Sequence, residues 1–267
     1  MAALTLLEPA SELLALLVLA CVQGVSEFLP ISSDGHLVLA ATWLHIGGPR
    51  LALEVALHIG TLCAVLLVYR RDLVAILQRL LKGDAREVGL LVLGSIPVAV
   101  VGLGLKALFE RLSESVLAAA LGLLVTAGFL LVGEWARRRN QRAGQARPIG
   151  WRDALWIGGF QAIAPLPGVS RSGTTIVTAL VRGIAPESAA RFSFLLSVPA
   201  VAGAVLLEVP HLVKEGGFGL ELVLAVVATF AIGVGALRFL IAFLGRGAFL
   251  WCAIYCVVLG IVALFFA

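Results

Sequence analysis

Long, continuous apolar segments occupy most of this 267-residue chain. Hydrophobic residues make up 61% of it, charged residues only 13%, and the mean hydropathy is +1.06, whereas soluble domains carry roughly 25% charged residues. A helix needs about 20 apolar residues to cross a bilayer, and these runs lack the two-residue alternation of membrane β-strands. The sequence therefore predicts an all-α polytopic membrane protein. The apolar segments are 11–29, 37–47, 52–69, 88–105, 115–133, 154–164, 175–184, 190–209, 219–240 and 248–266.

Two polar, glycine-containing loops interrupt these segments and resemble each other. The first is Q-G-V-S-E-F-L-P-I-S-S-D-G-H, residues 23–36, and the second is Q-A-I-A-P-L-P-G-V-S-R-S-G-T, residues 161–174. At a constant offset of 138 residues, a glutamine, a serine and a glycine of the first loop align with the same residues of the second. Polar loops at membrane depth persist only where protein buries them or where they line a wet cavity. We therefore expect the functional site in these loops.

The apolar segments beside the two loops indicate how the chain is organised. Segments 37–47, 154–164 and 175–184 are too short to span the hydrocarbon. Short, interrupted segments at matching positions of two halves are typical of inverted repeats. We predict a single membrane domain, 1–267, made of two inverted-topology repeats, each a re-entrant helix hairpin followed by three transmembrane helices. The first repeat covers about 11–133, a basic cytoplasmic linker covers 134–153, and the second repeat covers about 154–267.

The distribution of basic residues agrees with this topology. If the N-terminus lies outside and each hairpin returns to its own side, most of the 20 Lys and Arg residues lie on the cytoplasmic side. Loops 70–87 and 134–153 contribute many of them, as the positive-inside rule expects. Because the pI of about 9.2 reflects such short loops, no nucleic-acid partner is predicted.

The second loop has the composition of a phosphate cradle. Arg171 offers a planar guanidinium that suits phosphate oxygens, and backbone N–H groups at a helix start attract anions. Alternatively, the loop is a capped helix break with Arg171 paired to an acid. Burying an arginine at membrane depth costs at least ~2.5 kcal/mol, which favours function. The other predicted members of the cradle are Gly168, Ser170, Ser172, Gly173 and Thr175.

The first loop supplies complementary groups. Gln23 and Glu27 are four residues apart and share a helix face. Glu27 is able to bind a divalent cation, act as a base, or pair with Arg171. His36 is a candidate for proton transfer near neutral pH. Ser32 and Ser33 are each either a nucleophile or a helix cap.

Three further polar residues have open interpretations. Asp34 either caps the following helix or belongs to the site. Glu54 and His58 lie four residues apart in an apolar run, where they either extend the site or simply pair with each other.

The two loops resemble the signatures of the undecaprenyl-diphosphatase, or bacitracin-resistance, family of bacterial membrane proteins. One signature is E/Q-x-x-x-E followed by F-L-P-[VI]-S-S-x-G-H, which corresponds here to residues 23–27 and 28–36. The other is P-G-x-S-R-S-G-x-T, which residues 167–175 match without a gap. The first motif takes its glutamine option at Gln23, and Asp34 stands where threonine is common. A two-carboxylate metal site from the first motif alone is therefore not expected.

The resemblance implies hydrolysis of undecaprenyl diphosphate to undecaprenyl phosphate and inorganic phosphate, which recycles the lipid carrier for peptidoglycan. It further implies a divalent cation (Mg²⁺ or Ca²⁺) at Glu27, and a site in the bacterial plasma membrane that opens to the outer, periplasmic face. Membrane lipid and a possible homodimer are the other expected partners. The alternative class is a secondary transporter or flippase of an anionic lipid phosphate, since inverted repeats with broken helices are common there.

These inferences give a working mechanism. Arg171 and the N–H groups near Ser170 hold the diphosphate, Glu27 binds the metal or acts as base, and His36 moves a proton. Ser33 is the first choice of nucleophile and Ser170 the second, with direct attack by water as the alternative. The expected substrate-binding residues are Gln23, Ser32, Gly168, Ser172, Gly173 and Thr175.

Overall fold

A computed structural model describes residues 9–44, 51–143, 147–214, 219–244 and 247–267. Within these ranges the regular secondary structure is entirely helical. The helices are α1 (Pro9–Ser26), α2 (Ser33–Trp43), α3 (Leu51–Val68), α4 (Arg70–Leu81), α5 (Arg86–Gly104), α6 (Lys106–Leu112), α7 (Val116–Ala143), α8 (Trp151–Gln161), α9 (Arg171–Val181), α10 (Pro186–Lys214), α11 (Leu220–Phe243) and α12 (Ala248–Leu264).

Several of these helices are long and apolar enough to cross a membrane. Four qualify in the described part of the chain, namely 86–104, 116–142, 186–208 and 220–243, and a fifth does if α3 and α4 are counted as one bent span. The multi-pass, all-α character predicted from the sequence is confirmed. The short helices α2, α8 and α9 lie at the segments predicted to be too short to span.

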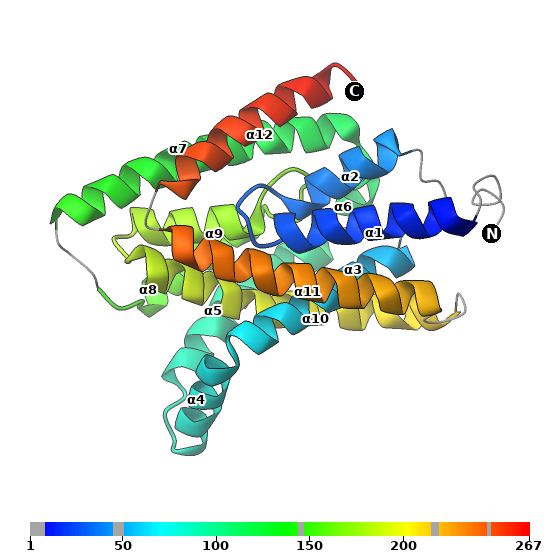
Figure 1. The fold of residues 1–267 in the computed structure, drawn as a ribbon. Helices are drawn as coiled ribbons and strands as arrows, with labels where there is room; N and C mark the ends of the chain where they lie inside the picture. Colours follow the sequence, from blue (N-terminus) through cyan, green and yellow to red (C-terminus); the bar gives the residue numbers. More distant parts are fainter. Residues whose placement is uncertain (1–8, 45–50, 144–146, 215–218, 245–246) are drawn as a thin grey trace.

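The bundle places both polar loops in its interior. Helix α12 packs along α7, α11 packs against α3 and α1, and α8 packs against α5, as Figure 1 shows. Each polar loop joins two helices that pack on each other, α1 with α2 and α8 with α9. Phe28 of the first loop is fully buried and its ring contacts that of Phe194 on α10. The loops are therefore part of the core, as polar backbone at membrane depth requires.

Two segments predicted as loops are wholly or partly helical. Residues 70–81 of the predicted loop 70–87 form α4, which meets α3 at 71° and projects from the bundle in Figure 1. In the predicted linker 134–153, α7 continues to Ala143. There Glu134 accepts hydrogen bonds from Arg137 and Arg138, at three and four residues' separation, at 2.7 and 2.6 Å. Such pairs stabilise a helix without apolar periodicity, so a search for apolar runs misses them.

Helix α7 holds the second loop through its backbone. Gly168 has a φ of +84°, and a Cβ atom there would lie 2.1 Å from the Ala119 carbonyl oxygen. A Cβ atom at Gly122 would lie 2.1 Å from the Pro167 carbonyl oxygen. The Thr126 hydroxyl donates to the Gly168 carbonyl at 2.7 Å and accepts from the Ser170 N–H at 2.9 Å. Glycine is thus required on both sides of this contact.

A buried carboxylate fixes the start of the second helical hairpin. Asp153 on α8 is 2% exposed and accepts two hydrogen bonds from Arg147, one from Arg182 and one from the Gly150 N–H, at 2.7–3.0 Å. Burial by itself raises the pKa of Asp153, but the hydrogen bonds from Arg147, Gly150 and Arg182 outweigh it. The pKa is therefore held well below its usual range.

Replacing Asp153 with asparagine is expected to lower the free energy of unfolding by about 2 kcal/mol. This loss is smaller than the loss from breaking a fully buried ion pair, because both arginines reach solvent. Because the pKa is lower in the folded state, this stabilisation is present above about pH 4 and is lost as the pH falls below that value. Thermal unfolding of both proteins in detergent should show a Tm gap that narrows from pH 7 to pH 3. Asp84→Asn, at an exposed aspartate, serves as control. A gap that does not change with pH would contradict this role.

Candidate functional site

The two polar loops make the same capping hydrogen bond where their sequences align, although Ser32 has a φ of +71° and Ser170 a φ of −74°. Ser32 and Ser170 each precede a helix, and each side-chain oxygen accepts a hydrogen bond from the backbone N–H three residues later, of Gly35 (3.3 Å) and Gly173 (3.0 Å). A Cβ atom at Gly35 would lie 2.8 Å from Gly168, so the first turn of α2 closely approaches the second loop just before α9. The partial positive charges of two helix N-termini are thus brought to one place.

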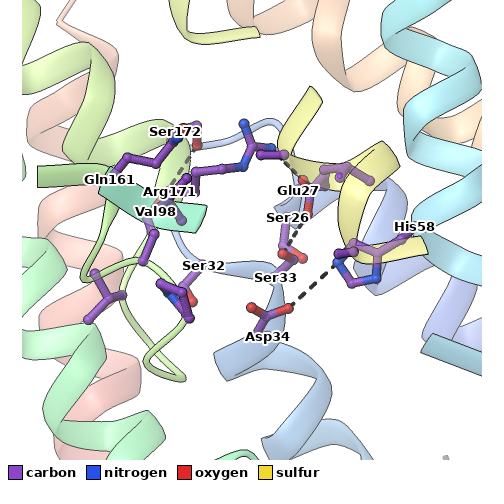
Figure 2. A pocket seen from close by; sticks show the side chains of 17 residues that line it. Ser26, Glu27, Ser32, Ser33, Asp34, His58, Val98, Gln161, Arg171 and Ser172 are labelled. Atoms are coloured by element: carbon purple, nitrogen blue, oxygen red, sulfur yellow. Dashed lines mark hydrogen bonds and ion pairs between the residues drawn. The ribbon is translucent and has the colours of Figure 1, made fainter. Parts of the chain in front are cut away.

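Three predicted site residues meet between the loops. Arg171 Nη2 donates a hydrogen bond to Glu27 Oε1 at 2.5 Å, and the Ser33 hydroxyl donates one to Glu27 Oε2 at 2.7 Å. Figure 2 shows this chain of contacts from Arg171 through Glu27 to Ser33. Of the three roles open to Glu27, pairing with Arg171 is confirmed. The same carboxylate lies within reach of the Ser33 proton, which is the geometry of a hydroxyl nucleophile beside a general base.

These residues line a cavity of 210 Å³. Its polar wall comes from the loops and the starts of α2 and α9, while α5 and α10 add small apolar side chains. Figure 2 shows the side chains around it. The lining residues are Ser26, Glu27, Ser32, Ser33, Asp34, His58, Val98, Gln161, Ala164, Pro165, Val169, Ser170, Arg171, Ser172, Ala200, Val201 and Ala204.

Several buried polar atoms near this cavity lack a protein partner. Among the described residues these are Arg171 Nη1, Gln23 Oε1, and both Nε2 and Oε1 of Gln161. Gln23 and Gln161 are fully buried, and they are equivalent in the two loops. Because an unsatisfied buried polar atom is costly, these donors and acceptors mark where a polar ligand group would bind. A phosphate would accept from Arg171 Nη1 and Gln161 Nε2.

The remaining predicted residues of the second loop take supporting positions. Ser172 lines the cavity, whereas Gly168, Gly173 and Thr175 do not. The Thr175 hydroxyl donates to the Arg171 carbonyl at 2.8 Å and pairs with the Ser193 hydroxyl at 2.6 Å. Thr175 therefore fixes the first turn of α9, on which Arg171 stands.

His36 is not brought to the cavity. Its Nδ1 lies 2.6 Å from the Ser32 carbonyl oxygen, and its Nε2 lies 2.7 Å from the hydroxyl of Tyr255 on α12, whose ring stacks on the imidazole. Both ring nitrogens are thus engaged away from Glu27 and Arg171. In this structure His36 holds the first loop against α12.

His58 takes the place in the cavity that the sequence suggested for His36. Its Nε2 lies 3.9 Å from Asp34 Oδ1, and both residues line the cavity. The sequence left both residues undecided. The helical spacing of Glu54 and His58, together with an aspartate at a position where threonine is common, was the only available signal.

The described residues contain no group of three His, Cys, Asp or Glu side chains able to hold a metal ion by themselves. The main candidate metal ligand at the cavity is a hard oxygen group, the carboxylate of Glu27. Its Oε2 also accepts a hydrogen bond from Gln23 Nε2 at 3.2 Å. Mg²⁺ is commonly held by one or two carboxylates together with substrate phosphates and water. The residues at the cavity fit this arrangement, in which one carboxylate acts together with the phosphates of the substrate.

Comparisons with known proteins agree with the motifs. The family model for bacitracin resistance protein BacA matches residues 16–262. An undecaprenyl-diphosphatase of Rhodopirellula baltica is 38% identical over 94% of this chain and 96% of its own. Proteins of the same name from Desulfosudis oleivorans and Korarchaeum cryptofilum are 40% and 37% identical, over 92% and 95% of this chain and 96% and 98% of their own. The chain therefore belongs to the BacA family.

Proposed function

We propose that this protein hydrolyses undecaprenyl diphosphate to undecaprenyl phosphate and inorganic phosphate. The observation that carries the proposal is the contact series Arg171–Glu27–Ser33, which brings a guanidinium, a carboxylate and a hydroxyl together at one cavity. Membership of a family whose relatives are named undecaprenyl-diphosphatase supports the choice of substrate. None of the named relatives carries a transporter's name, so we do not favour the transporter alternative.

In the proposed mechanism, the terminal phosphate binds between the two helix N-termini and accepts a hydrogen bond from Arg171 Nη1. Ser33 Oγ attacks the terminal phosphorus while its proton passes to Glu27 Oε2 at 2.7 Å. The bond from phosphorus to the bridging oxygen breaks, and its electron pair leaves with undecaprenyl phosphate. Arg171 and the N–H groups at the start of α9 stabilise the charge that develops on the transferred phosphoryl oxygens.

A divalent cation is proposed as cofactor, and Glu27 would hold it together with the phosphate oxygens, as the alternative to acting as base. Its contribution would be to neutralise phosphate charge. Adding a chelator is expected to lower turnover by at least about 100-fold, because the electrostatic stabilisation of a phosphoryl group is large. Measuring phosphate release before chelation, after chelation and after returning Mg²⁺ or Ca²⁺ tests this expectation. Full activity in a chelator that strips bound ions would rule out the cofactor.

The remaining proposals concern the setting of the site. We place the protein in the bacterial plasma membrane with the cavity open to the periplasmic face, where the polyprenyl tail stays in lipid. The short hairpins α1–α2 and α8–α9 are proposed to be re-entrant and related as inverted repeats, which the equivalent capping hydrogen bonds of Ser32 and Ser170 support. A homodimer is the proposed assembly.

The direct experiment is phosphate release from undecaprenyl diphosphate by purified protein in detergent, where no transmembrane gradient exists. We expect turnover by the wild type and its loss in Arg171→Ala. Absence of release from well-folded wild type would overturn the proposed function, and a flux assay in liposomes would then test transport.

A further inference from the structure

The cavity contains a histidine–carboxylate pair that the mechanism so far does not use. His58 on α3 and Asp34 on α2 face each other across it, with Nε2 and Oδ1 3.9 Å apart, as the dashed line in Figure 2 marks. The His58 side chain is 28% exposed and that of Asp34 is 48% exposed, so both are accessible from the cavity. They come from two different helices, which residues 44–50 separate in the chain.

A backbone contact fixes the chemistry of the imidazole. His58 Nδ1 lies 2.8 Å from the Glu54 carbonyl oxygen, one turn earlier in α3. A carbonyl only accepts, so Nδ1 carries the hydrogen in the neutral ring. Nε2 is then the nitrogen that gains and loses a proton, and it is the one that faces Asp34 and the cavity.

Charged groups around His58 define its electrostatic setting. Glu27 and Asp34 face it from the first loop and α2, Glu54 lies on its own helix, and Arg171 lines the same cavity from α9. Helix α10 adds only apolar lining side chains near this wall. Glu27 is occupied by Arg171 and Ser33, whereas Asp34 faces His58.

We propose that His58, oriented by Asp34, is a second proton-transfer residue that activates the water hydrolysing the phosphorylated Ser33. This inference rests on the proposed function. Water oxygen attacks the phosphorus while one of its protons passes to His58 Nε2. The bond from phosphorus to Ser33 Oγ breaks, its electron pair returns to Oγ, and Oγ regains the proton held by Glu27. Hydrogen phosphate leaves, and His58 releases its proton to the solvent in the cavity.

Glu27 and His58 have different tasks as bases in this mechanism. In the proposed mechanism Glu27 still holds the serine proton when the water attacks, so a second group has to accept the proton of the water. A neutral imidazole near physiological pH suits the second task, since a base is most effective when its proton affinity matches the working pH. Asp34 acts as a positioning residue, because it stabilises the protonated ring.

The test uses purified protein with undecaprenyl diphosphate carrying a labelled terminal phosphate. We expect His58→Gln to lower kcat by about 100-fold, the lower end for general base catalysis, and to accumulate labelled, acid-stable phosphoserine after a rapid quench. The kcat ratio of wild type to His58→Gln should rise with pH between 5 and 8, because only neutral His58 acts as base. Comparing ratios cancels the ionisation of the substrate itself.

Asp34→Asn provides the second variant and Asp84→Asn its matched control. Removing the carboxylate should move the acidic limb of the Asp34→Asn profile to lower pH, whereas Asp84→Asn should leave the profile unchanged. An active wild type with equal kcat in His58→Gln, or a kcat ratio that is flat with pH, would overturn the role of His58 alone. An inactive, folded wild type would instead overturn the proposed function. If His58→Gln does not fold, an unshifted Asp34→Asn profile still refutes the pair.

Discussion

Replacing Arg171 with lysine is expected to reduce kcat by about 100- to 1,000-fold, the range found when one preorganised charge-stabilising donor is removed. In the structure, one terminal nitrogen of Arg171 holds Glu27 at 2.5 Å while the other is buried without a protein partner. A lysine ammonium is a single point charge on a flexible stem, so it does not reproduce the planar fork that serves both groups. Phosphate release under saturating substrate measures the effect.

The matched control is Arg111→Lys, at an exposed arginine on α6. It should retain wild-type turnover, and both variants should unfold at temperatures close to wild type. Near-normal kcat in Arg171→Lys would show that Arg171 does not need to bind Glu27 and the phosphate at the same time. The ion pair with Glu27 would then be only structural.

Replacing Ser33 with alanine is expected to lower kcat by at least about 1,000-fold, since loss of a covalent nucleophile removes a whole reaction path. The Ser33 hydroxyl donates to Glu27 at 2.7 Å and lies on the cavity wall. If water attacked phosphorus directly, the variant would lose only one hydrogen bond to a carboxylate, worth roughly 1.5–3 kcal/mol and therefore about 10- to 150-fold in rate. The magnitude of the loss thus identifies the nucleophile.

Ser170→Ala separates this effect from the loss of any serine in the site. The Ser170 oxygen accepts from the Gly173 N–H at 3.0 Å and caps α9. We expect its removal to cost about 1 kcal/mol of stability and less than about tenfold in kcat, since a cap stabilises the helix rather than the reaction. A deeper loss of activity in Ser170→Ala than in Ser33→Ala would exchange their roles.

The sequence predicted which loops form the site but not which neighbouring residue performs each role. Ser32 and Ser33 are adjacent, and which of them caps α2 depends on a helix start that sequence locates only within a residue or two. His36 lies in a motif, yet its orientation depends on Tyr255, more than 200 residues away. His58 was undecided because its partner Asp34 comes from a different helix. Contacts of this kind join side chains of different helices, so they leave little pattern in the local sequence.

The fold was predictable where apolar runs dominate and less so where charged helices continue beyond them. The end of α7 is held by Glu134 and its arginines. Helix α4 is amphipathic, with Arg70, Arg71 and Asp72 in its first turn and exposed leucines beyond. Neither has the continuous hydropathy by which spans are recognised, so the sequence predicts loops at both places.

The close approach of α7 to the second loop has a consequence for how this chain tolerates substitution. Any side chain at Gly122 or Gly168 would meet a backbone atom about 2.1 Å away, and backbone, unlike a side chain, has no alternative rotamer with which to yield. The loop that carries Arg171 is therefore positioned by a contact that compensating mutations of neighbouring side chains cannot restore. By contrast, the exposed Leu121 and Val125 of α7 are free to vary among apolar residues. Substitution would thus be tolerated at the exposed positions of α7 but not at Gly122 or Gly168.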